Sequence, residues 1–120
     1  MKNIDLHIGY DPAASKARVL QAIRQAEAGP VEPETHVTFQ SWKGLSRVLT
    51  GKRLELLRHV RKTPAASIAD LARALGRDYK RVHEDVEILA TVGLLDRTEN
   101  GSVQAAYDEI RTVIDLTQAA

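Results

Sequence analysis

The 120-residue sequence predicts an α+β fold. Alternating apolar and polar residues near both ends indicate strands, and three consecutive patterns with helical spacing occupy the middle. After these patterns in the chain, an Asn-Gly pair separates two short apolar runs, as in a hairpin. Hydrophobic residues make up 43% and charged residues 28% of the chain, which is the composition of a soluble globular protein. Because only 4% of the residues are aromatic, the core must be aliphatic.

The first 48 residues predict a strand–helix–strand–helix extension. Apolar residues alternate with polar ones over 3–10, which is typical of a half-buried strand. Asp-Pro at 11–12 suits the N-cap and first position of a helix over 13–28. A second strand is expected over 36–40 and a second helix over 41–49.

Trp42, the only tryptophan, lies in the amphipathic stretch 41–49. We expect it to pack in the core against the first of the middle helices. The alternative is that it anchors a dimer or partner interface, where tryptophan is enriched.

Three helices are expected in close succession in the middle of the chain. The first covers 52–62 and the second 68–75, which Ser67 caps and Gly76 closes. The third runs from a cap at Asp78 to about Thr91.

A hairpin and a terminal strand are expected after the helices. Strands over 94–98 and 102–107 flank a turn that contains Asn-Gly, the strongest short hairpin signal. The tail over 108–116 alternates as a strand does, although its apolar spacing also suits a helix. We favour a strand, which can return to pair with the N-terminal strands and tie both ends into one sheet.

The spacing of small and apolar residues between 71 and 95 predicts two closely packed helices and a wing. Ala72 is small where the next helix crosses, and Gly76 allows a sharp turn. An apolar stripe from Val82 to Leu89 anchors the last helix, whose opposite face is free to enter a DNA major groove. Helix, helix, turn, helix and hairpin is the order of a winged helix-turn-helix.

Residues 49–107 resemble a winged-helix DNA-binding domain of the MarR/ArsR/GntR type. Three strings resemble, more narrowly, a group of predicted prokaryotic regulators encoded beside RelE-like or TumE-like toxins: LTGKRLELL at 49–57, GRDYKRVHEDV at 76–86 and YDEIR at 107–111. Members of this group are considered antitoxins. The resemblance covers most of the chain and implies a dimeric DNA-binding repressor that also binds a small toxin protein.

The third middle helix supplies the candidate base contacts. With Val82 at the centre of the buried face, a step of 100° per residue places Lys80 and Glu84 on the outer face. The N-terminal end of a recognition helix usually meets the base edges, so we expect base contacts from Lys80, Arg81, His83 and Glu84. Lysine or arginine can read guanine, and Glu84 can accept from cytosine. The alternative for Glu84 is a solvated surface charge.

Candidate phosphate contacts surround that helix. They lie at its entry, on neighbouring elements and in the wing: Arg77, Tyr79, Lys52, Ser67, Arg73 and Arg97. For Tyr79 the alternative is core packing. Arg97 is the only basic residue of the wing, so a single domain is expected to bind weakly. A dimer would place two recognition helices roughly 34–36 Å apart on a palindromic site.

Charge is unevenly distributed along the chain, although its net value is +1. Residues 47–81 contain ten basic and three acidic residues, a net charge of +7, whereas residues 82–120 carry −6. This field is compatible with phosphate binding by the middle segment. The alternative is a pair of oppositely charged solvated faces.

Several classes of function are not expected. The absence of cysteine excludes disulfides, cysteine zinc sites, iron–sulfur clusters and thiol nucleophiles, and it fits a cytoplasmic protein. No apolar run approaches the roughly 20 residues of a membrane span, and no signal-peptide stretch is seen. No nucleophile elbow, P-loop or dinucleotide-binding motif is present, so no catalytic site or cofactor is expected. A metal site on His83, Glu84 and Glu87 is disfavoured, because a DNA-facing or solvated histidine is more common.

We therefore expect a cytoplasmic, non-enzymatic repressor of its own operon. Its expected partners are double-stranded DNA, a second copy of the chain and a small toxin protein. Residues 1–48 are assigned to dimerisation or partner binding, 49–107 to the winged helix-turn-helix, and 108–120 to a C-terminal strand or tail. The alternative is a winged-helix module that binds only proteins. The near-neutral wing favours that alternative, and the +7 segment opposes it.

Overall fold

The computed structural model describes residues 2–9, 16–17, 19–21, 23–24, 35–114 and 116–117. The expected helix over 13–28 lies largely outside these residues, and its described positions are helical. The fold is mixed α+β, as predicted. Its elements in chain order are β1 (Asn3–Ile8), β2 (Thr35–Phe39), α2 (Trp42–Val48), α3 (Gly51–Lys62), α4 (Ile68–Leu75), α5 (Tyr79–Thr91), β3 (Asp96–Arg97), β4 (Val103–Gln104) and β5 (Glu109–Thr112).

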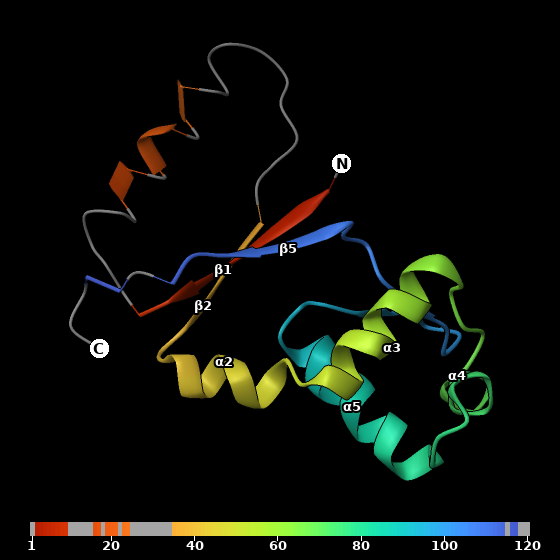
Figure 1. Ribbon diagram of the computed structural model, residues 1–120. Coiled ribbons are helices and arrows are strands. Elements are labelled where there is room, and N and C mark those ends of the chain that lie inside the picture. The colour runs from red at the N-terminus through yellow and green to blue at the C-terminus, as the bar shows by residue number, and fades with distance from the viewer. Residues whose placement is uncertain are drawn as a thin grey trace.

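A three-stranded parallel sheet of order β2-β1-β5 forms one end of the molecule (Figure 1). Ile4 of the central strand pairs with Thr35 on one side and with Ile110 on the other. Successive side chains of a strand point to opposite faces, so Ile4 and Leu6 share one face and both are buried. The prediction that the tail forms a strand beside the N-terminal strands is confirmed.

The described helices α2 to α5 each begin at a side-chain cap. The hydroxyl groups of Ser41, Thr50 and Ser67 and the carboxylate of Asp78 each accept a hydrogen bond from the backbone N–H three residues further on. The caps at Ser67 and Asp78 are the predicted ones. None of the helices in the described part of the chain is long and apolar enough to cross a bilayer.

Helices α3, α4 and α5 pack against one another at the other end of the molecule, and α2 connects them to the sheet (Figure 1). Ala72 of α4 and Val82 of α5 are buried, as their spacing predicts. Gly76 ends α4 with a left-handed φ of 63°, which glycine adopts without strain and which turns the chain sharply into α5.

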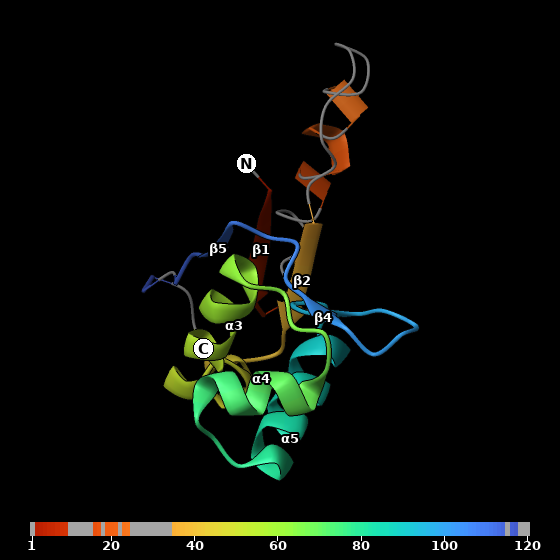
Figure 2. The same ribbon diagram turned by 90° about the vertical axis from the view of Figure 1, so that its right-hand side faces the viewer.

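The hairpin β3–β4 follows α5 and projects to one side of α4 and α5 (Figure 2). Its strands are shorter than predicted, with Asp96 opposite Gln104 and Arg97 opposite Val103. The hairpin is attached at its base. The backbone N–H of Ala65, between α3 and α4, donates to the Val103 carbonyl at 3.0 Å, and the Val103 N–H donates back at 2.8 Å.

One aliphatic core joins the sheet to the helices. Its members include Ile4 and Leu6 of β1, Leu45 of α2, Leu56 of α3 and Val86 of α5, all buried. The core therefore extends across the boundary that the sequence suggests between residues 48 and 49.

Trp42 does not pack in this core, and the prediction that it does is wrong. Its side chain is 54% exposed, whereas Leu45 one turn later is 2% exposed. Leu45 is the buried residue of α2, so this helix meets the core through Leu45 and not through its first residue. The alternative that the sequence offers, in which Trp42 anchors a dimer or partner interface, stays a prediction.

Candidate functional site

The first turns of α5 and the start of α3 border a shallow depression of about 510 Å³. Lys80, Arg81 and Glu84 of α5 line it together with Lys52 of α3, and all four are exposed. Arg77, Asp78 and Asp85 complete the lining. The fold thus brings three of the four predicted base contacts together with two predicted phosphate contacts, Lys52 and Arg77.

His83 and Tyr79 lie one turn apart on α5 but do not line this depression. Their ring centroids are 5.9 Å apart with the planes tilted by 44°. Tyr79 is 53% exposed, so its ring does not pack in the core. Core packing, the alternative that the sequence offers for Tyr79, is therefore wrong. His83 is half-buried, and its Nε2 lies 3.8 Å from Oε1 of Glu87.

Asp85 is a buried carboxylate that fixes α5 from behind. Its Oδ1 accepts a hydrogen bond from Nε of Arg53 at 2.9 Å, and its Oδ2 accepts one from Nη2 of Arg77 at 2.8 Å. Arg53 belongs to the neighbouring helix α3, so this ion pair joins α5 to α3. Charge-assisted bonds of this kind are shorter and stronger than neutral ones.

Arg53 extends this pairing to a third helix. Its Nη1 donates to the backbone carbonyls of Arg47 at 2.6 Å and Val48 at 3.0 Å, at the end of α2. The carboxylate of Asp85 thereby links α5, α3, the end of α2 and the turn before α5. No role for Arg53 follows from the sequence, because helical spacing does not say which of several arginines meets the buried acid.

Arg77 is held mainly inside the protein. Its side chain is 17% exposed, and its Nη1 is buried without a hydrogen-bond partner among the described atoms. A buried donor without a partner carries a desolvation cost. The phosphate contact expected from Arg77 stays a prediction, and its observed partner is Asp85.

Three other predicted phosphate contacts have neighbours within the chain. The Ser67 hydroxyl accepts from the Asp70 N–H at 3.1 Å as the cap of α4. Arg73 forms an ion pair with Asp70, and Arg97 forms one with Glu87 of α5. By contrast, Lys52, Lys80 and Arg81 form no ion pair within the described part of the chain, so their charges are open to a partner.

The electrostatic character of the depression is cationic. Two of its acidic residues already have partners within the protein. Asp85 pairs with two arginines, and Asp78 accepts a hydrogen bond from the Arg81 N–H at 3.2 Å as the cap of α5. Glu84 is the remaining exposed carboxylate. Among the residues that the structure describes, no group of three or more histidine, aspartate or glutamate side chains is arranged to hold a metal ion.

The geometry defines an α+β protein in which a short hairpin follows three packed helices and the last helix presents a cationic first turn. A family model described as HVO_A0114 matches residues 48–112, more than half of the chain, and the chain belongs to this family. The match runs from the end of α2 to the end of β5 and includes the whole depression. No curated protein and no solved structure matches the chain.

Proposed function

We propose that the chain is a sequence-specific double-stranded DNA-binding regulator that represses transcription of its own operon. The observation that carries the proposal is the first turn of α5, where Lys80 and Arg81 are exposed beside Lys52 with no acidic partner in the described part of the chain. The same helix is fixed from behind by the buried Asp85. A rigid helix with free cations at its N-terminal end fits the major groove.

The order of the elements supports a winged helix-turn-helix over residues 49–107. In this proposal α5 is the recognition helix, α4 is its partner, and the β3–β4 hairpin is the wing. The sharp turn at Gly76 supports the close pairing of α4 with α5. The backbone bonds between Ala65 and Val103 support the attachment of the wing.

The proposed contacts divide by chemistry. Lys80 and Arg81 donate to guanine edges, Glu84 accepts from cytosine, and His83 contacts bases at the edge of the same helix. The remaining contacts are to phosphates, which position the protein without reading sequence: Lys52, Ser67, Arg73, Arg77, Tyr79 and Arg97. Because few of these cations are free, we propose that a homodimer on two half-sites provides useful affinity.

The test is fluorescence anisotropy with the duplex upstream of the protein's own gene, from about 50 to 200 mM salt. We expect specific binding with a steep salt dependence, and its loss in the Lys80→Gln/Arg81→Gln variant. The matched control is Arg58→Gln/Lys62→Gln, which removes the same charge from α3 outside the depression and is expected to bind as the wild type does. Specific binding that survives in the first variant contradicts the assignment of α5.

We also propose that the protein is the antitoxin of a toxin–antitoxin pair. The resemblance to regulators encoded beside RelE-like or TumE-like toxins supports this second role. Trp42 and the residues after β5 offer exposed apolar side chains for a toxin or a second copy, since Val113 is 83% and Leu116 is 91% exposed. Affinity capture that recovers no small basic protein, together with a genomic neighbourhood without a toxin gene, removes this role and leaves the regulator proposal standing.

One observation favours a second function, a winged-helix module that binds only proteins. Arg97 is the one basic residue of the wing, and its guanidinium pairs with Glu87. The same anisotropy experiment separates the two functions. Weak binding that is equal for every duplex and insensitive to salt would support the protein-binding module.

A further inference from the structure

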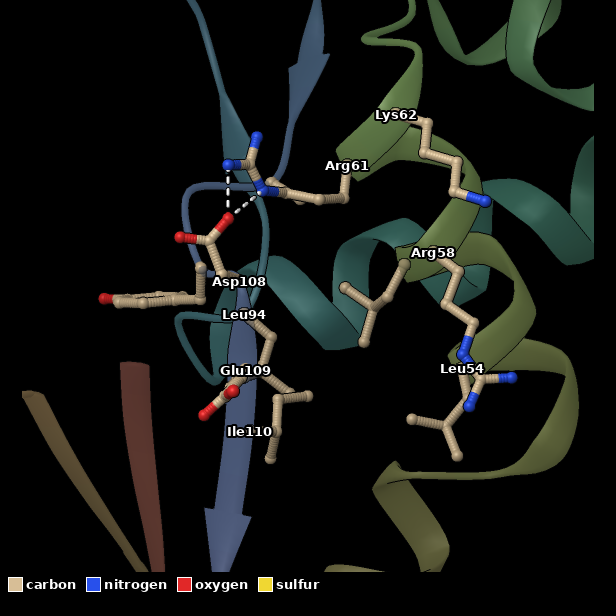
Figure 3. Close-up of a pocket in the computed structure, with 11 residues that line it drawn as sticks. Leu54, Arg58, Arg61, Lys62, Leu94, Asp108, Glu109 and Ile110 are labelled. Atoms are coloured by element: carbon tan, nitrogen blue, oxygen red, sulfur yellow. Dashed lines mark hydrogen bonds and ion pairs between the residues drawn. The ribbon is translucent and has the colours of Figure 1, made fainter. Parts of the chain in front are cut away.

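A second cavity, of about 450 Å³, lies between α3 and the segment that ends in β5 (Figure 3). It is separate from the depression on α5, because no residue of α5 lines it. Figure 3 shows Arg58 and Lys62 on the helix at one side and Asp108, Glu109 and Ile110 on the strand segment at the other. Its volume falls in the range of roughly 300–1,000 Å³ that is usual for small-molecule sites.

The inner surface of this cavity is apolar. Leu57 and Leu94 line it and are buried, and Leu54, Ala105 and Ile110 line it and are partly buried. Tyr107 adds an aromatic ring to the same lining. The apolar part of a ligand would therefore be removed from water on contact with these side chains, which is favourable in proportion to the area buried.

The rim of the cavity has an excess of positive charge. Arg61 is neutralised by Asp108, whose Oδ1 accepts from Arg61 Nε at 3.0 Å, and Glu109 pairs with Arg111 at 3.0 Å. Arg58 and Lys62 have no such partner in the described part of the chain. They stand four residues apart on α3, a spacing that places two side chains next to each other on one face of a helix.

We propose that this cavity binds a small amphipathic carboxylate. The apolar body lies against Leu54, Leu94 and Ile110, and the carboxylate accepts hydrogen bonds from Arg58 and Lys62. An arginine fork matches a carboxylate in geometry, and lysine adds a second positive charge. A neutral ligand leaves both cations unpaired, and a cationic ligand is repelled by them. The proposal does not depend on DNA binding, because its test measures ligand binding alone.

The test uses the full chain and octanoate as the probe, followed by NMR of the leucine and isoleucine methyl groups. We expect saturable shifts concentrated on Leu54, Leu57, Leu94 and Ile110. Octan-1-ol has the same apolar chain and no charge. It is expected to bind at least about tenfold more weakly than octanoate, because it lacks roughly one charge-assisted interaction. No saturable shift, equal binding of the alcohol, or shifts centred on other methyl groups would overturn the proposal.

Two variants locate the ligand within the cavity. Arg58→Gln/Lys62→Gln is expected to weaken octanoate binding about tenfold or more, while the matched Lys80→Gln/Arg81→Gln variant changes it by less than about twofold, because distant sites act independently. Ala105→Leu keeps both cations but fills part of the cavity, and it is expected to weaken octanoate and octan-1-ol alike. Thermal unfolding of each variant confirms that the fold is retained. Equal losses in the two charge variants would show non-specific attraction and contradict the site.

Discussion

Asp85 is a single buried side chain on which three helices and a turn depend. It is 8% exposed and accepts from Arg53 and Arg77, while Arg53 also reaches the end of α2. Removing one member of a buried charge network leaves the others uncompensated, which costs more than the pair itself contributes.

We therefore predict that Asp85→Ala lowers the free energy of unfolding by about 3–5 kcal/mol. The measurement is urea unfolding followed by circular dichroism. The control is Glu84→Ala, which removes the neighbouring exposed carboxylate and should change stability by about 0.5 kcal/mol or less. Similar effects for the two variants would show that the Asp85 pairs contribute little.

Asp108 links three segments at the start of β5. Its carboxylate accepts from Arg61 and from the backbone N–H of Lys2 at 2.9 Å, and these two hydrogen bonds, Arg61 first, hold the pKa of Asp108 below its usual 3.8. A carboxyl group whose pKa is lower in the folded state stabilises the fold fully above the unfolded value. That stabilisation is lost as the pH falls through the lowered folded pKa.

We predict that Asp108→Asn destabilises the protein at pH 7 and that the difference from the wild type shrinks as the pH falls below 3.8. Thermal melting between pH 7 and pH 3 checks this. A difference that stays constant over the whole range would contradict the assignment of the two hydrogen bonds to the ionised form.

At the scale of the element, the role of Ser67 that the structure shows is to cap helix α4. Its hydroxyl group accepts the Asp70 N–H at the start of that helix. We predict that Ser67→Ala lowers the free energy of unfolding by about 1 kcal/mol and that Ser67→Asp, which keeps a cap, restores most of it. Chemical denaturation measures both. An unstable Ser67→Asp variant would show that the hydroxyl does more than cap.

The elements that the sequence predicts well are those with local signals. Caps at Ser67 and Asp78 and the left-handed Gly76 act within a few residues, so their positions follow from the sequence alone. Trp42 and Arg53 are different. Whether Trp42 meets the core depends on where α2 crosses it, and the partner of Arg53 lies 32 residues away. Such contacts depend on tertiary packing, which periodicity does not specify.

At the scale of the whole molecule, the sheet and the helices share one core. Ile4 is fully buried in the central strand and contributes to the same cluster as Leu56 and Val86 of the helices. The sequence predicts that both ends join one sheet. Within the parallel order β2-β1-β5, the pairing of β1 with β5 joins residues more than 100 positions apart, for which no local signal exists.

We predict that Ile4→Ala lowers the free energy of unfolding by about 2–5 kcal/mol and that Ile4→Val costs about 1 kcal/mol. Because the core is shared, the helical signal at 222 nm should melt in one transition that moves to lower temperature in both variants. If the 222 nm transition is unchanged in Ile4→Ala, the helices are stable without the sheet.

The position of β1 has a consequence for synthesis on the ribosome. Lys2 and Asp108, which hold β1 and β5 together at their start, are 106 residues apart. At about 5–20 residues per second, β1 is made roughly 5–20 seconds before the strand that completes its sheet. Contacts among α3, α4 and α5 are local and can form first, since short-range contacts form fastest. A nascent chain can therefore present a finished α5 while one edge of β1 is still open to chaperones and proteases.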